Sequence, residues 1–305
     1  MPHAIQFDDY GPPEVLHLVE VPELTAGPGR IRVAVRAAGV NPIDWKIRSG
    51  AMRDAFGVQF PNTPGAEFSG VVDQVGEGVT GVAVGDEVLG RGSATYAEQA
   101  VVDPAAIEPK PADLAWEQAA ALPVAVSAAY RVLVPFGLEA GQTLLVDGAA
   151  GGVGGILVQV ARARGVHVIG TASERNHARL RELGATPIPY GDGLAERVRA
   201  IAPNGVDAAA DLVGKGSLET LVGLTGDPAR VVTIADFANA GRFGVRATGG
   251  PDKPPADALA DALHLLADGK LQVPVGSVYP LAEAAAAQRE SESGRSDGRI
   301  VLRVS

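Results

Sequence analysis

The glycine-rich stretch at residues 148–154, Gly-Ala-Ala-Gly-Gly-Val-Gly, contains the residues best suited to bind a ligand. It follows an apolar run at residues 143–146 and precedes residues 156–163, whose apolar positions have helical spacing. At a strand-to-helix turn of this kind, free backbone N–H groups and the positive end of the helix attract a phosphate. The stretch therefore predicts a dinucleotide site, with the pyrophosphate against Ala150, Gly151, Gly152, Val153 and Gly154.

Two other interpretations of these glycines are a plain hairpin and a nucleoside-triphosphate loop. Aligned on the six-position dinucleotide fingerprint, residues 149–154 have glycine at the second and third conserved positions but alanine at the first. The hairpin remains an alternative, although a strand before and a helix after the glycines favour the nucleotide site. No Gly-Lys-Ser/Thr sequence follows, so the triphosphate loop is excluded.

The residues after the next expected strand, at residues 166–171, should lie near the adenosine ribose. They are Ser173, Glu174 and Arg175. If Ser173 faces the ribose, no carboxylate repels a 2′-phosphate, and Arg175 supplies positive charge to it. If Glu174 faces the ribose, its carboxylate would instead accept from both ribose hydroxyls. We expect Ser173 and Arg175 to contact the cofactor, which favours NADPH over NADH.

These residues need a parallel sheet to position them. Up to about residue 110 the chain is β-rich, with strands expected at residues 15–21, 30–40 and 68–75. A helix is expected at residues 116–134. Beyond residue 141, helical segments alternate with short buried strands, expected at residues 144–146, 166–171, 207–212 and 230–234. The fold class predicted is α/β, with a doubly wound parallel sheet and a second, β-rich domain. The isolated strands near the C-terminus are expected to return to that β-rich domain.

Composition limits the function classes. The 305 residues are 46% hydrophobic, carry a net charge of −10 and include no cysteine. We therefore expect no nucleic-acid partner, no membrane partner and no thiolate chemistry. The sequence shows no targeting or membrane segment, so the cytoplasm is the expected location.

Eight short segments carry a resemblance to a known family. They are residues 39–44 (GVNPID), 64–70 (PGAEFSG), 75–79 (VGEGV), 85–88 (GDEV), 96–98 (YAE), 148–154 (GAAGGVG), 183–185 (LGA) and 298–302 (GRIVL). In these the chain resembles the zinc-free, zeta-crystallin-like quinone oxidoreductases of the medium-chain dehydrogenase/reductase superfamily. The resemblance implies a GroES-like domain at residues 1–118 and 252–305, a Rossmann domain at residues 119–251, and hydride transfer in the cleft between them.

Departures from the zinc alcohol dehydrogenases of that superfamily bear on the chemistry. Asn41 stands where they have a cysteine ligand, and Ala66 where they have a histidine ligand, so no metal is expected. Without a Lewis acid, the hydride acceptor must delocalise the charge that it receives. The expected substrate is therefore a quinone or a conjugated enone.

The resemblance also implies roles for individual side chains. Asn41 is the expected amide donor to the acceptor oxygen. Asp44 and Lys46 are possible catalytic residues, with a helix cap and a solvated side chain as the respective alternatives. Ser127 is a further expected cofactor contact, with a helix-internal hydrogen bond as the alternative. Tyr190 is expected beside the 2′-phosphate. Ile234 and Phe237 are expected at the nicotinamide. The expected substrate-lining aromatics are Trp45, Phe56 and Phe60. Arg299 replaces the lysine usual in the family.

The sequence thus predicts an NADPH-dependent quinone or enone oxidoreductase that works without a metal, and the resemblance implies a homodimer. A non-enzymatic NADPH-binding sensor is one alternative, and an enoyl-thioester reductase is another.

Overall fold

The computed structural model describes residues 1–55, 57–249, 252 and 254–304. The chain forms two compact units. The first comprises Met1–Val124 and Val273–Ser305, and the second comprises Ala125–Gln272. The sequence-based boundaries, at 118/119 and 251/252, lie a few residues before the first of these divisions and about twenty before the second. Residue 251 itself is outside the described residues.

The first unit is built on a seven-stranded sheet in the order β14-β15-β3-β4-β5-β7, with β6 also paired to β3, beside a separate β1-β2 pair. Its strands are β1 (His3–Gln6), β2 (His17–Glu20), β3 (Ile31–Val40), β4 (Glu67–Val75), β5 (Glu87–Arg91), β6 (Gln99–Val102), β7 (Ile107–Pro109), β14 (Val275–Pro280) and β15 (Arg299–Arg303). β15 runs antiparallel to β3, with Val301 opposite Gly39. The C-terminal strands therefore join the N-terminal sheet, as the sequence predicts.

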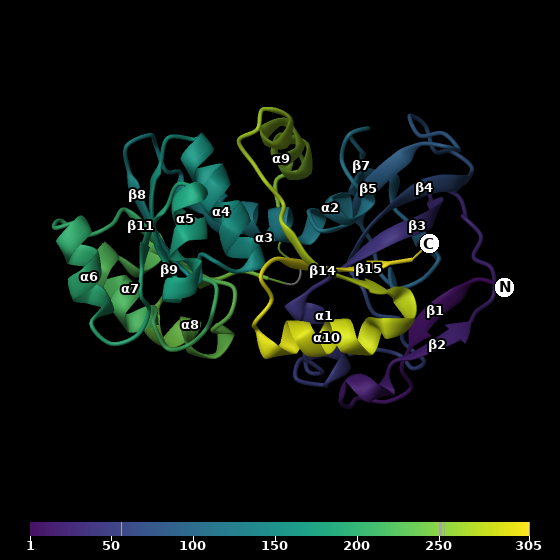
Figure 1. Cartoon of the computed structure of the whole chain (residues 1–305), viewed down its shortest axis with the longest axis horizontal. Helices are drawn as coiled ribbons and strands as arrows, with labels where there is room; N and C mark the ends of the chain where they lie inside the picture. Colours follow the sequence, from purple (N-terminus) through teal and green to yellow (C-terminus); the bar gives the residue numbers. More distant parts are fainter. Residues whose placement is uncertain (56, 250–251, 253, 305) are drawn as a thin grey trace. The chain divides into compact units, whose positions relative to one another are not determined.

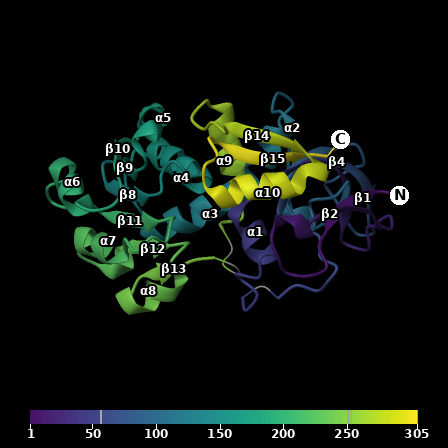
Figure 2. The ribbon, with the colours of Figure 1, turned by 60° about the horizontal axis from the view of Figure 1, so that its bottom comes forward.

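Among the described residues, the first unit has three α-helices: α1 (Pro42–Arg48), α2 (Trp116–Ala120) and α10 (Ala284–Ser293). α1 and α10 lie side by side in both ribbon views (Figures 1 and 2). α3 (Pro123–Leu133) runs on from the first unit into the second. The sequence predicted one helix over residues 116–134, but the structure has two. The helix is interrupted before Pro123 because proline has no N–H to continue it and favours a helix start.

The second unit contains a six-stranded sheet, and every pairing in it is parallel. Its order is β10-β9-β8-β11-β12-β13. In chain order the strands are therefore arranged 3-2-1-4-5-6, the arrangement of a dinucleotide-binding Rossmann sheet. The strands are β8 (Thr143–Asp147), β9 (His167–Thr171), β10 (Thr186–Ile188), β11 (Ala208–Asp211), β12 (Val231–Thr233) and β13 (Arg246–Ala247).

Helices cover both faces of this sheet. α4 (Gly152–Ala163) and α5 (His177–Glu182) lie on one face, and α7 (Leu218–Thr225) and α8 (Phe237–Phe243) lie on the other, as right-handed crossovers would place them. Both ribbon views agree with this arrangement (Figures 1 and 2). α6 (Leu194–Ile201) and α9 (Ala258–Ala267) complete the unit. The strand order reverses between β8 and β11. In open α/β sheets, ligands bind outside the carboxyl ends of the strands at such a reversal.

Candidate active site

The turn between β8 and α4 has the backbone that a pyrophosphate site needs. Gly148 has φ +90°, a left-handed conformation that glycine adopts without strain, and α4 begins at Gly152 after the N-cap Gly151. The tight-turn glycine is therefore Gly148, one residue before the alanine that the fingerprint alignment put there. At Gly154 a Cβ would lie 2.4 Å from the Gly148 carbonyl oxygen, so only glycine lets α4 approach β8 this closely.

The space in front of this turn is open. Gly151 and Gly152 are exposed, and Ala150 and Val153 are half-buried. A Cβ at Gly151 would meet no atom closer than 3.4 Å, so the backbone is accessible to a ligand. The first turn of a helix leaves its N–H groups without intrahelical acceptors. The residues present thus fit a pyrophosphate.

The residues expected at the adenosine ribose follow β9. Ser173 is half-buried and accepts a hydrogen bond from the Asn176 amide at 3.2 Å, whereas Glu174 and Arg175 are exposed. Tyr190, after β10, has 61% of its surface exposed. These groups follow the carboxyl ends of β9 and β10. Both strands lie on the same side of the reversal in strand order between β8 and β11.

Three further expected cofactor residues lie on other elements of the second unit. Ile234 follows β12, and its N–H donates to the Asp211 carbonyl. Phe237 begins α8 and is 48% exposed, with its ring against Gly249. Ser127 is buried in α3 and accepts from Arg131 one turn later, which is the helix-internal bond that the sequence left as an alternative.

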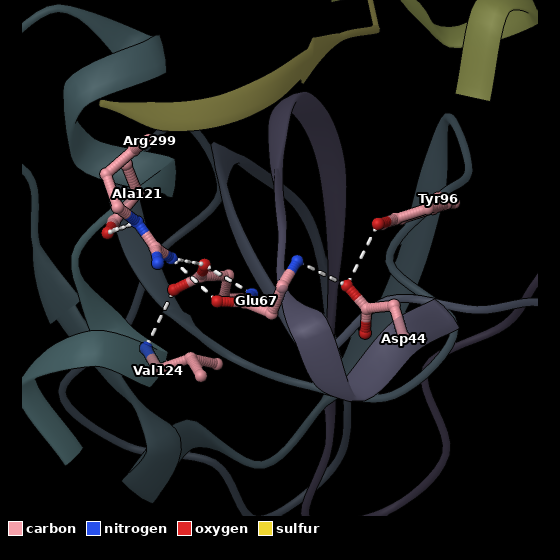
Figure 3. Close-up of polar contacts among 7 residues, drawn as sticks. Asp44, Glu67, Tyr96, Ala121, Val124 and Arg299 are labelled. Atoms are coloured by element: carbon pink, nitrogen blue, oxygen red, sulfur yellow. Dashed lines mark hydrogen bonds and ion pairs between the residues drawn. The ribbon is translucent and has the colours of Figure 1, made fainter. Parts of the chain in front are cut away.

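In the first unit, Asn41 belongs to a buried polar network with Glu67 and Arg299. Figure 3 labels these two partners. The Asn41 amide nitrogen donates to Glu67 Oε1 at 2.7 Å, and its amide oxygen accepts from Arg299 at 2.7 Å. Arg299 also donates to Glu67 Oε1 at 2.6 Å and to the Ala121 carbonyl at 3.0 Å. These partners fix which way the Asn41 amide faces, because its NH₂ must point to the carboxylate and its oxygen to the guanidinium.

Glu67 is the centre of this network and has no exposed surface. Its second oxygen, Oε2, accepts from the backbone N–H of Val124 at 2.7 Å, in the first turn of α3. Donors from three separate segments therefore converge on one carboxylate and the adjoining amide. A buried ion pair is tolerated when its remaining hydrogen-bonding capacity is satisfied in this way.

Asp44 lies in the first turn of α1, close to the same network (Figure 3). Its Oδ2 accepts from the Asn41 backbone N–H at 2.8 Å, which caps the helix, and from the Tyr96 hydroxyl at 2.9 Å. The cap that the sequence offered as an alternative is therefore present. Burial raises the pKa of Asp44 to about 7, and the nearby Glu67 charge adds to the effect, while its two hydrogen bonds and Arg299 oppose it.

The other expected residues of this unit are more peripheral. Lys46 is half-buried, with its Nζ 5.7 Å from the centre of the Trp45 ring. The Trp45 indole nitrogen is buried and has no hydrogen-bond partner among the described residues. Phe60 is 40% exposed and packs edge-on against Phe7 and Tyr10. Phe56 lies outside the described residues.

Glu67, Tyr96 and Arg299 lie within the motifs given above, but the sequence did not predict that Glu67 pairs with Arg299 or that Tyr96 pairs with Asp44. A signal was available for two of them. Glu67 precedes the run Phe-Ser-Gly-Val-Val, and Arg299 precedes Ile-Val-Leu, so each charge adjoins a buried strand and needs a partner. The pairing itself joins residues 232 positions apart, which no local pattern indicates.

The described part of the chain lacks two further features. Within it, no group of three or more His, Asp or Glu side chains could hold a metal ion. No helix in the same residues has the length and apolar character to cross a bilayer.

Comparisons with known families and proteins agree with this architecture. Residues 27–112 match the alcohol dehydrogenase GroES-like domain, and residues 183–302 match the zinc-binding dehydrogenase family. The quinone oxidoreductase of Pseudomonas aeruginosa is 34% identical over 99% of both chains. The 2-methylene-furan-3-one reductase of Solanum lycopersicum is 31% identical over 98% of this chain and 78% of its own length. The polyketide synthase protein NorB of Streptomyces orinoci is 35% identical, but this chain spans only 14% of its length.

Solved structures show the same similarity. The quinone oxidoreductase from Coxiella burnetii has a TM-score of 0.85 and 30% identity, with 100% of this chain and 99% of that one covered. A mycobacterial protein solved in complex with NADPH has a TM-score of 0.85 and 29% identity, covering 99% of this chain and 100% of that one.

A GroES-like sheet unit joined to a Rossmann unit defines the medium-chain dehydrogenases/reductases, an oxidoreductase superfamily. Within that superfamily the chain belongs to the quinone oxidoreductase family.

Proposed function

We propose that the protein is an NADPH-dependent oxidoreductase that transfers a hydride to a quinone or a conjugated enone without a metal. The observation that carries this proposal is the fixed amide of Asn41. Glu67 accepts one of its two N–H hydrogens, which leaves the other to bind an acceptor oxygen. A neutral amide can stabilise negative charge on that oxygen only if the charge is already spread over the acceptor, as in a quinone or an enone.

The chain's own residues have separable tasks in this reaction. The turn at residues 148–154 would hold the pyrophosphate, with Ile234 and Phe237 near the nicotinamide. When bound, the reduced nicotinamide supplies the hydride. Asn41 would orient the acceptor oxygen, and Glu67 with Arg299 would keep the Asn41 amide from flipping.

Absence of a catalytic metal is supported by the donor set. In zinc-dependent relatives the Asn41 and Ala66 positions carry metal ligands, and neither an amide held by an ion pair nor a methyl group replaces a thiolate or an imidazole. A substrate such as a simple alcohol, which depends on a Lewis acid, is therefore not expected to react.

Preference for NADPH over NADH is supported by the residues after β9. Arg175 is exposed and free to reach a 2′-phosphate, and Ser173 puts no carboxylate beside it. A neighbour of the same fold was solved with NADPH. The homodimer expected from the sequence remains a prediction.

The test is oxidation of NADPH by the purified protein with a panel of quinones, short enones and simple alcohols. Turnover is expected with the first two classes and is expected to survive treatment with a chelator. Asn41→Ala should reduce kcat by about tenfold to a hundredfold, the loss typical of one or two hydrogen bonds to a developing charge, with NADPH affinity unchanged. Turnover that is restricted to alcohols, or that disappears with the chelator, would contradict the proposal.

A second candidate is reduction of an enoyl thioester, in which the conjugated carbonyl belongs to a thioester. The similarity to a stretch of NorB, a polyketide synthase protein, favours it. An enoyl thioester included in the same panel decides between the two, since the preferred acceptor is the one with the higher kcat/KM.

A further inference from the structure

Four residues form a symmetric row across the four central strands of the second unit. In the sheet order β9-β8-β11-β12, the last residue of each strand is Thr171, Asp147, Asp211 and Thr233. Asp147 is the registered neighbour of Asp211, and Asp211 is the registered neighbour of Thr233. All four are buried, with at most 6% of their surface exposed.

The first half of the row holds the start of the phosphate turn. The Thr171 hydroxyl donates to Asp147 Oδ1 and accepts from the Gly148 backbone N–H at 2.9 Å. Gly148 is the residue whose left-handed backbone begins the turn. Its conformation is therefore tied to both β8 and β9 through one hydroxyl group.

The second half holds two loops after the other strands. Asp211 Oδ1 accepts from the N–H groups of Val213 and Gly214, at 3.0 and 2.8 Å, and its Oδ2 accepts from the Thr233 hydroxyl at 2.7 Å. Thr233 in turn accepts from the N–H groups of Ala235 and Asp236, at 3.0 and 2.9 Å. One aspartate–threonine pair therefore fixes the loops that leave both β11 and β12.

The row is centred on the point where the strand order reverses. A dinucleotide binds across that point, with the adenosine half over the first three strands and the nicotinamide half over the last three. Each half of the sheet thus has its own aspartate–threonine pair under the loops that face its half of the ligand. We propose that Asp147–Thr171 positions the adenosine-phosphate end of the cofactor and that Asp211–Thr233 positions the nicotinamide end. This inference rests on the proposed function, and it assigns all four as positioning residues.

Two matched substitutions separate the halves. Thr171→Val and Thr233→Val each remove one buried hydroxyl with nearly unchanged shape. Thr225→Val is the control, because its hydroxyl is also hydrogen-bonded, donating to the Val222 or Asp227 carbonyl and accepting from the Asp227 N–H, but at the far end of α7. Affinity is measured by calorimetry for NADPH and for 2′,5′-ADP, which carries only the adenosine end, and folding is checked by thermal melting.

The two variants are expected to differ in which ligand they lose. Thr233→Val should weaken NADPH by about tenfold and leave 2′,5′-ADP within about twofold, since loops that have lost one or two hydrogen bonds must be reordered on binding. Thr171→Val should weaken both ligands by about tenfold. Thr171→Ser and Thr233→Ser keep the hydroxyl and should retain the affinity of the wild type.

Other results overturn the inference. If Thr233→Val weakened 2′,5′-ADP as much as it weakened NADPH, the two pairs would not act on separate halves of the cofactor. Unchanged affinity for both ligands in both variants would lead to the same conclusion. Loss in Thr225→Val as large as in the others would reduce the effect to general destabilisation. If the wild-type chain binds neither ligand, the proposed function itself fails, and this inference fails with it.

Discussion

Gly39 on β3 lies directly against the carboxylate of Glu67 on β4. A Cβ at residue 39 would stand 2.1 Å from Glu67 Oε1 and 2.7 Å from the Ala120 carbonyl oxygen. The hydrogen of glycine is thus what leaves room for the buried carboxylate that holds Asn41 and Arg299. Gly39 and Glu67 therefore decide whether the Asn41 amide, the proposed donor, is correctly oriented.

Gly39→Ala is expected to destabilise the first unit by about 1–3 kcal/mol, the usual cost of overpacking a filled core. It should also lower kcat, because Glu67 must move away from Asn41. Gly27→Ala is a matched control, since a Cβ there meets nothing within 4 Å. Thermal melting and steady-state kinetics of both variants check the prediction, and a normal melting temperature for Gly39→Ala would refute it.

Asp44 should make stability depend on pH. Its ordinary pKa is 3.8, and burial raises it to about 7 in the folded chain. Between these values the folded state holds a proton that the unfolded state has lost, so the free energy of unfolding falls as pH rises from about 4 to about 7 and is level above that. Each tenfold difference in proton affinity between the two states corresponds to about 1.4 kcal/mol.

Asp44→Asn removes this titration while its amide oxygen can still accept from Asn41 and Tyr96. Denaturant unfolding at several pH values should therefore show a smaller loss of stability between pH 4 and 7 than in the wild type. Tyr96→Phe should act in the opposite direction, because the hydroxyl lowers the pKa of Asp44 and its removal extends the fall above pH 7. Identical pH profiles for all three proteins would rule out the assignment.

Much of the fold was predictable from local pattern, whereas the site was predictable only in part. The alternation of apolar runs and helical segments predicts the parallel sheet, because each buried strand and its covering helix leave their own periodicity. Asn41 and Asp44 are three residues apart, so their shared helix start was also visible. Glu67 and Arg299 meet only because β15 returns to pair with β3, and that pairing depends on the whole sheet.

The row at the switch point shows a signal that could have been used. Four predicted strands end in or next to threonine or aspartate, and the carboxyl ends of parallel strands meet at one edge. The sequence alone does not give the strand order β9-β8-β11-β12. Without that order, nothing shows whether Thr171 pairs with Asp147 or with Asp211. Polar strand ends are therefore predictable as a set, but their partners follow from topology.

Arg175 should decide between the two nicotinamide cofactors. Arg175→Ala is expected to weaken NADPH severalfold and leave NADH unchanged, because only NADPH has the 2′-phosphate, and the loss should shrink at high salt. Ser173→Asp should shift preference further toward NADH by repelling that phosphate. Arg181→Ala, at an exposed arginine of α5, is the control. Affinities for both cofactors check this, and equal loss of NADH would contradict it.

Gly154 and Gly155 are neighbours in α4 but differ in the room around them. A Cβ at Gly154 would lie 2.4 Å from the Gly148 carbonyl oxygen and 2.7 Å from the Ala149 Cα, both in rigid backbone. At Gly155 the nearest atom would be Leu183 Cδ1 at 3.7 Å, an ordinary contact. Gly154→Ala should therefore push the helix start away from β8, lower the melting temperature and reduce NADPH affinity by at least about tenfold. Gly155→Ala should leave NADPH affinity unchanged and should not lower the melting temperature. Because the two substitutions add the same methyl group to the same helix, helix propensity is matched between them. Equal affinities in the two variants would mean that the close approach of α4 to β8 does not shape the pyrophosphate site.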